Sequence, residues 1–281
     1  MTLFHPRKLL AIDWRSDEFP SLPDVARKVM ELRSSDDISA TELEEVIARD
    51  PGLAMKVLQV VNSGYYGLSR EVTSVLHAIT LLGVTPVLDM AMSAIMARRF
   101  MTMPPPVIPY AKRLYRHCVA TALLARDMDY EADGPDLYTL GLLHDIGWLP
   151  VLAQVPDVFV SMFNDSSLER SELEGAWGTD HQLWGAKLAE LWGLPEAFML
   201  VAYRHHDPMR ETAPPRHLLL VSIAHHLADA AGQSLFLSDV EIIPPEVTEA
   251  AGIDQDTFFE MEKAAVEQKD SISALCNVLI G

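Results

Sequence analysis

The sequence has few cysteines, no long apolar run and few basic residues. Its 281 residues include only Cys118 and Cys276, too few for a disulfide framework or a thiolate zinc site. We expect both to be buried thiols. No apolar stretch reaches the roughly 18 residues of a membrane-spanning helix, and the start lacks a signal-peptide core with a small-residue cleavage site. We therefore expect a cytoplasmic protein without a membrane partner.

The shortage of basic side chains limits the choice of partner. The chain carries 22 Lys and Arg against 40 Asp and Glu, which gives a formal net charge of −18. Such a charge repels polyphosphate backbones, so we expect no nucleic-acid partner. The apolar fraction of 49% is typical of a globular chain and argues against intrinsic disorder.

Helical patterning dominates what is present. Ser39 and Glu42 are spaced as a capping box ahead of apolar residues at helical intervals. Asp50 followed by Pro51 is typical of the start of a second helix. Strand signals are weak, with no Asn-Gly hairpin. The sequence therefore predicts an all-α fold. Its further helices lie near 75–82, 86–103, 110–130, 136–147, 150–163, 180–192, 195–205, 216–231 and 255–279.

A proline-rich segment divides this pattern. Residues 104–109 read PPPVIP, which cannot form the interior of a helix. We interpret the segment as a linker or a sharp change of chain direction. The sequence thus predicts two helical lobes, residues 1–103 and residues 104–281.

Histidines accompany the predicted helices of the second lobe. His117 shares the inward face of its helix with Leu114 and Thr121, because the three are spaced by three or four residues. His144 and Asp145 stand inside the apolar stretch GLLHDIGWLP, residues 141–150, where burial of polar groups without partners is costly. The other histidines of interest lie on three further predicted helices, the last also carrying Asp229: His181, His205, His206, His225 and His226.

These residue types suit a metal site. Imidazole and carboxylate ligands are typical of Mn, Fe, Zn and Ni. Neighbouring positions on a helix diverge by about 100°, so His144 and Asp145 do not form a simple chelating pair. They can instead span a two-metal site, or one can coordinate while the other orients a neighbour. The alternative for each histidine is a hydrogen-bonded core residue. Taken jointly, the clusters favour one common pocket.

Several segments resemble the HDOD family, the HD-related output domain of bacterial signalling proteins. FPSLPDVARKVMEL (19–32), DPGLAMKVLQVVNSGYYG (50–67) and VTSVLHAITLLGV (72–84) resemble its N-terminal part. LYRHCVATALLAR (114–126), TLGLLHDIGWL (139–149), GTDHQLWGAKLAELWGLPEAF (178–198) and HHDP (205–208) resemble its second part. The resemblance covers roughly residues 19–230. It implies an HD-domain-like helical core with an additional N-terminal helical lobe, as one continuous module followed by a C-terminal helix.

The resemblance also implies a function. It indicates a bacterial signal-transduction output or regulatory module that acts through protein interactions. The partners would be signalling proteins, such as receiver or cyclic-dinucleotide-domain proteins, or a second copy of the chain. The alternative is a metal-dependent HD-type phosphohydrolase of a nucleotide or phosphoester, with Asp145 as the candidate catalytic residue. The implied ligands of one or two Fe, Mn, Zn or Ni ions are His117, His144, Asp145, His181, His205 and His206.

Two departures from the family pattern bear on this expectation. HD enzymes supply a late aspartate after an alanine, whereas this chain reads Ala224-His225. We therefore add His225 to the ligand set and expect Asp229, one turn later, to be a poor substitute for the missing carboxylate. The Gly-Tyr-Pro segment of cyclic-dinucleotide-cleaving relatives is replaced by DPMRETAPPRH (207–217), so we do not expect that activity.

Overall fold

The computed structural model describes residues 20–35, 38–128, 134–164, 180–235 and 242–281. Every regular element within these ranges is helical, and they contain no β-strand. The all-α prediction is therefore confirmed. None of the helices in the described ranges is both long and apolar enough to cross a membrane.

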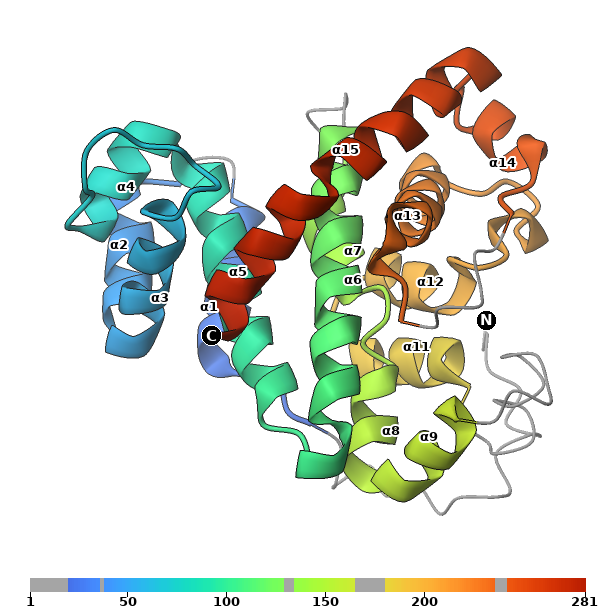
Figure 1. Cartoon of the computed structure of the whole chain (residues 1–281), viewed down its shortest axis with the longest axis horizontal. Coiled ribbons are helices and arrows are strands. Elements are labelled where there is room, and N and C mark those ends of the chain that lie inside the picture. Colours follow the sequence, from blue (N-terminus) through green and yellow to red (C-terminus); the bar gives the residue numbers. More distant parts are fainter. Residues whose placement is uncertain (1–19, 36–37, 129–133, 165–179, 236–241) are drawn as a thin grey trace.

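Two helices of the N-terminal lobe begin at the capping residues that the sequence predicts, whereas α5 begins at Val84, two residues before the predicted start. The Ser39 hydroxyl accepts a hydrogen bond from the Glu42 backbone, while the Glu42 carboxylate accepts one from Ser39 N–H at 3.1 Å. The Asp50 carboxylate accepts from Leu53 N–H at 3.0 Å. These contacts satisfy amide groups that the first turn of a helix leaves unpaired. The helices, shown on the left of Figure 1, are α1 (Asp24–Arg33), α2 (Ala40–Ala48), α3 (Pro51–Val61), α4 (Val75–Leu82) and α5 (Val84–Met101).

The second half contains more interruptions than the sequence predicts. PPPVIP forms only a short 3-10 turn at Pro105–Val107, and Pro109 lies within the first turn of the next helix, where its missing N–H costs nothing. The helix predicted over 150–163 breaks at Val155, because the following proline disfavours helical geometry there. The helices are α6 (Ile108–Asp127), α7 (Leu137–Leu143), α8 (Trp148–Gln154), α9 (Pro156–Phe163), α11 (His181–Leu191), α12 (Glu196–Arg204), α13 (Arg216–Ala228), α14 (Pro245–Ala250) and α15 (Gln255–Ile280).

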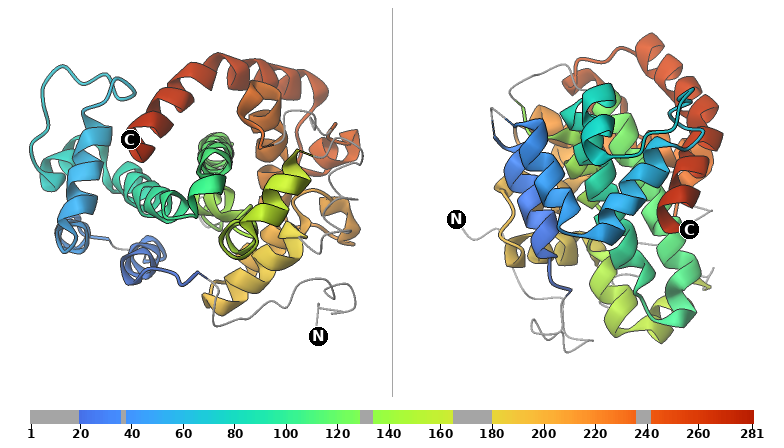
Figure 2. Two further views of the ribbon diagram at one scale, coloured as in Figure 1. Left: turned by 60° about the horizontal axis from the view of Figure 1, so that its bottom comes forward. Right: turned by 90° about the vertical axis from the view of Figure 1, so that its left-hand side faces the viewer.

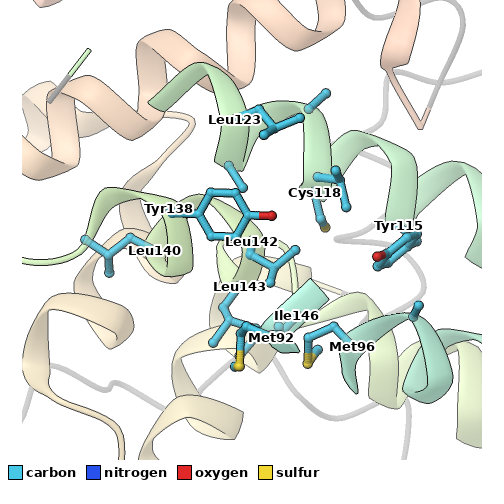
Figure 3. Close-up of a cluster of buried hydrophobic side chains, with 14 of the residues drawn as sticks. Met92, Met96, Tyr115, Cys118, Leu123, Tyr138, Leu140, Leu142, Leu143 and Ile146 are labelled. Atoms are coloured by element: carbon cyan, nitrogen blue, oxygen red, sulfur yellow. The ribbon is translucent and has the colours of Figure 1, made fainter. Parts of the chain in front are cut away.

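The helices α5, α6 and α7 meet in the buried centre of the protein (Figure 3). Tyr138 and Ser93 share a hydrogen bond of 2.6 Å between their hydroxyls, and the Tyr115 hydroxyl donates to Ser93 O at 2.9 Å. A Cβ on Gly141 of α7 would lie 2.8 Å from Ala122 Cα of α6. Only glycine therefore permits this close approach of α6 and α7, which carry His117 and His144 toward each other.

The C-terminal helix α15 crosses the molecule from the second half to the N-terminal lobe (Figures 1 and 2). Near its end, Lys56 Nζ of α3 donates to Val278 O at 3.0 Å, and Arg116 of α6 donates to the Asn277 side chain at 2.7 Å. Buried side chains from both predicted lobes form one continuous hydrophobic cluster. The lobe boundary at 103/104 stays a prediction.

Candidate metal centre

The structure brings all of the predicted ligands together. His117 lies on α6 and His225 on α13, while His181 is the first residue of α11. His205 and His206 directly follow α12. His144 and Asp145 lie in the turn between α7 and α8, because α7 ends at Leu143 and not near 147 as predicted. The two side chains nevertheless converge, with Asp145 Oδ2 and His144 Nε2 close enough to share one ion.

Three imidazoles and one carboxylate form a first group. His117 Nε2 is 3.2 Å from His144 Nε2 and 3.0 Å from His225 Nδ1, and the latter two nitrogens are 3.1 Å apart. Asp145 Oδ2 lies 3.6 Å from His144 Nε2 and 3.8 Å from His117 Nε2. All four residues are buried. The group could hold one metal ion.

The other oxygen of Asp145 belongs to a second group. Asp145 Oδ1 is 3.3 Å from His181 Nε2 and 3.3 Å from His205 Nε2. His181 Nε2 is in turn 3.1 Å from His206 Nε2. The His181 ring stacks on Trp148 with centroids 4.8 Å apart and planes 7° apart, which fixes its orientation. One carboxylate is thus shared by two groups of potential ligands.

Outer contacts fix the tautomers of the inward histidines. His144 Nδ1 lies 2.6 Å from Gly141 O, and His205 Nδ1 lies 3.0 Å from Val201 O. A carbonyl oxygen only accepts, so both Nδ1 atoms donate the hydrogen bond. In a neutral imidazole, Nε2 then has no proton and directs its lone pair at the centre. This is the arrangement by which outer partners orient histidine ligands of metals.

Asp229 lies beside the centre but outside both groups of potential ligands, in keeping with the expectation that it is a poor substitute for the missing carboxylate ligand. It is 3% exposed, with Oδ1 3.3 Å from His117 Nδ1 and Oδ2 3.6 Å from His225 Nε2. Its carboxylate therefore faces the outer nitrogens of two histidines whose other nitrogens face the first group. Asp229 thus places a buried carboxyl group behind the ligands, where it can orient two of them, and not in the position of the missing aspartate.

The electrostatics favour the metal-binding protonation states. Burial, aided by the neighbouring imidazoles, lowers the pKa of His144 to about 3 and that of His225 well below its ordinary value. Burial alone would raise the pKa of Asp145, but the surrounding His144, His205 and His181 outweigh it and hold that pKa well below its usual range. Neutral imidazole and ionised carboxylate are the forms that bind metal ions.

The donor atoms of both groups are arranged as ligands of a metal ion would be. His205 Nε2 and Asp145 Oδ1 face each other, and the hydrogen-bond geometry among the described residues gives neither atom another partner. Two lone pairs 3.3 Å apart repel unless a cation or a proton lies between them. Ligand atoms bound at roughly 2.0–2.1 Å to one ion lie about 3 Å from one another. The three imidazole nitrogens of the first group have such separations, as do the pairs His181–His206, His181–Asp145 and His205–Asp145 of the second.

Little space remains at the centre. The described residues enclose a cavity of about 10 Å³ there, lined by His117, Asp145, Trp148, His181 and Asp229 among others. This volume accommodates about one water molecule. His226 does not join the groups, because its Nε2 pairs with Glu262 Oε1 at 3.1 Å.

The fold and the site together define an all-helical, HD-domain-like protein with a candidate metal centre. Comparison with known proteins identifies the family: the HDOD domain matches residues 19–208. The chain belongs to the HDOD family, and the resemblance found in its sequence is confirmed.

Solved structures share this fold. An HDOD domain protein of unknown function from Geobacter sulfurreducens superposes with a TM-score of 0.76 at 22% identity, over 92% of this chain and 94% of that one. A proposed signal transduction protein from Marinobacter aquaeolei VT8 superposes with a TM-score of 0.74 at 25% identity, over 94% of this chain and 60% of that one. A proposed metal-dependent phosphohydrolase from Shewanella amazonensis SB2B superposes with a TM-score of 0.57 at 22% identity, over 90% of this chain and 92% of that one.

A curated relative is much longer than this chain. An uncharacterized protein from Treponema pallidum is 23% identical over 198 residues, which represent 69% of this chain and 38% of that protein. The chain thus spans well under half the length of this relative.

Proposed function

We propose that the protein is a signal-transduction module of the HDOD type whose buried centre binds one or two divalent transition-metal ions. The observation that carries the metal assignment is the convergence of two groups of four donor residues that share Asp145, with the donor atoms of each group within 4.8 Å of one another. Asp145 would bridge the two ions. The first would be held by His117, His144, Asp145 and His225, and the second by Asp145, His181, His205 and His206.

Each group offers four protein ligands. If the bound ion is zinc, four ligands would complete a closed structural site, whereas catalytic zinc sites keep a position open. Bound ions would cross-link α6, α11, α12, α13 and the turn after α7. Occupancy would therefore stabilise one arrangement of the second half. We propose that this arrangement is presented to signalling proteins, such as receiver or cyclic-dinucleotide-domain proteins, or to a second copy of the chain.

The metal assignment is tested by elemental analysis of protein purified without a histidine tag. We expect at least one equivalent of Mn, Fe, Zn or Ni in the wild type and a clear loss in His144→Ala. His77→Ala is the matched control, because His77 is exposed on α4, away from the centre. Less than one equivalent of any transition metal, with melting unchanged by a chelator, would contradict the proposal.

The interaction role is tested separately. Light scattering after gel filtration would measure self-association of the metal-loaded and chelator-treated wild type, and capture from a bacterial lysate would sample partners. We expect self-association or a captured signalling protein that depends on metal. Absence of both would leave the signalling role without support.

A second candidate function is a metal-dependent phosphohydrolase. It is favoured by the shared Asp145 carboxylate and by the water-sized cavity beside it. Bound ions polarise a phosphoryl oxygen and lower the pKa of a bound water. A nearby histidine outside the ligand set would assist the proton transfer. Phosphoesters would be screened with manganese for the wild type and for Asp145→Ala, and equal background rates would exclude the activity.

A further inference from the structure

The wall of the cavity at the metal centre is thin at two places. The cavity accommodates about one water molecule, so neither a hydrated ion nor a phosphoester can enter it unless the wall moves. Among the described residues that line it, only His206 and Ser234 are partly exposed, and the others are buried. His206 belongs to the groups of potential ligands, whereas Ser234 does not. Movement at Ser234 would therefore open the cavity without removing a ligand.

Ser234 belongs to a short segment that separates the cavity from solvent. We call residues 232–235, which read GQSL, the strap. Leu235 is 4% exposed and lines the cavity together with Ser234, while Gly232 is exposed. Gly232 has a φ of +74°, a conformation that glycine adopts without strain. The chain leaves its helical path at this residue, which is therefore suited to be the hinge of the strap.

Two side-chain hydrogen bonds hold the strap to neighbouring helices. Arg113 of α6 donates from Nη2 to Ser234 O at 3.1 Å, and Gln233 donates from Nε2 to Ser273 Oγ of α15 at 3.0 Å. The Arg113 guanidinium also lies 5.4 Å from the centre of the Phe163 ring. None of these residues belongs to either group of potential ligands. Because a single hydrogen bond contributes modestly to stability, the strap is able to open while the surrounding helices stay folded.

We propose that the strap is a gate over the metal centre and that Arg113 is the latch that holds it closed. The gate itself depends only on residues of the chain. Its role in the exchange of metal rests on the function proposed above. The strap supplies no ligand, so loosening it should speed the entry and the release of an ion equally and leave the affinity unchanged. In the signalling module, the latch would set how fast the centre responds to a change in metal concentration.

The gate is tested first without metal, on the chelator-treated full chain. Diethyl pyrocarbonate modifies unprotonated imidazoles and is larger than the water-sized cavity, so it reaches His117 and His225 only when the wall opens. Peptide mapping by mass spectrometry measures the rate of reaction of each histidine, and the exposed His77 is the internal standard. Arg113→Met keeps the stem of the side chain and removes the donor. Lys112→Met is the matched control, because it removes the same charge from the neighbouring position of α6.

We expect Arg113→Met to raise the rate at His117 and His225 about tenfold over the wild type, and Lys112→Met to stay within twofold of it. Equal rates at the centre in the two variants would overturn the gate. An equal rise at His217, which lies in the first turn of α13 and does not line the cavity, would show general loosening of the fold and would also overturn it. If circular dichroism shows that Arg113→Met does not fold, Gln233→Leu takes its place with the same expectation.

The role in metal exchange is tested separately with zinc-loaded protein and a coloured zinc chelator. We expect Arg113→Met to load and to release zinc about tenfold faster than Lys112→Met, with affinities equal within twofold. Faster release with unchanged loading would overturn this role, because the effect would then lie in the affinity. Equal rates in the two variants would also overturn it and would place the passage of ions beside His206. If the wild type binds no transition metal, the metal function and this role fail together, whereas the imidazole experiment still decides the gate.

Discussion

Gly147 is where the turn that carries His144 and Asp145 contacts α11. A Cβ built on Gly147 would overlap His181 O and would lie 2.5 Å from Gly185 N. Its φ of −63° is ordinary for any residue, so the requirement for glycine is steric. Both obstructing atoms belong to the backbone and cannot rotate away. In Gly147→Ala, the turn and α11 must therefore separate.

The expected cost follows from this geometry. Overpacking a well-packed interior costs typically 1–3 kcal/mol, and rigid backbone places this substitution at the upper end, about 3 kcal/mol. Separation would also draw Asp145 away from His181, which are 3.3 Å apart at their facing atoms. We therefore expect Gly147→Ala to lose both unfolding free energy and metal in the second group.

Urea unfolding and manganese titration measure the two effects. Gly64→Ala is the matched control, since a Cβ there meets nothing within 4 Å. We expect the control to stay within about 0.5 kcal/mol of the wild type, as surface substitutions usually do. An unfolding free energy of Gly147→Ala equally close to the wild type would refute the reasoning.

Three further predictions follow from buried charge. Asp229→Asn keeps the shape of the side chain but removes its charge, and we expect calorimetry to show about 10–100-fold weaker metal affinity; an unchanged affinity would count against the orienting role. Because the folded-state pKa of His144, about 3, lies below its unfolded value near 6.5, its contribution to stability is complete above pH 6.5 and is lost as the pH falls toward 3. Chelator-treated protein should thus lose roughly 2 kcal/mol between pH 8 and pH 5 from this residue, and urea unfolding of His144→Ala should show a weaker pH dependence. Asp89 is 3% exposed and forms ion pairs with Arg33 of the N-terminal lobe and Arg126 of α6. Asp89→Ala should lower the unfolding free energy by about 3 kcal/mol, because it leaves two buried cations without their partner. A loss below about 1 kcal/mol would contradict a structural role for these ion pairs.

Helix starts were predictable because they depend on local chemistry. The side chains of the capping residues Ser39 and Asp50 accept hydrogen bonds from backbone amides three positions later. The local sequence is therefore sufficient to predict where these helices begin. The end of α7 was not predictable in this way. Apolar residues continue through Ile146 and Leu149, since the turn after Leu143 is as buried as the helix. Hydrophobic periodicity reports burial, and here a buried turn gives the same pattern as a buried helix.

The ligand set was predictable from residue types, and its geometry was not. Histidines on separate helices indicated a common pocket, but nothing in the spacing showed that Asp145 directs its two oxygens to different groups. The role of Asp229 did have a signal. His225 and Asp229 are four residues apart, which places both on one helix face.

A buried centre needs a physical connection if its state is to be read elsewhere, and α15 supplies one. Asp229 begins the π-helical turn Asp229–Gln233. In that turn, the Gln233 side chain donates to Ser273 Oγ of α15 at 3.0 Å. Five residues further along α15, Val278 O accepts a hydrogen bond from Lys56 of the N-terminal lobe. A displacement of Asp229 would therefore act on a helix anchored in both halves. Gln233→Ala should weaken this connection without touching a ligand: we expect unchanged metal affinity by titration, with a reduced effect of metal on hydrogen exchange in α3. If metal changed hydrogen exchange in α3 of Gln233→Ala as much as in the wild type, the connection between the centre and the N-terminal lobe would run through α5 and α6 and not through α15.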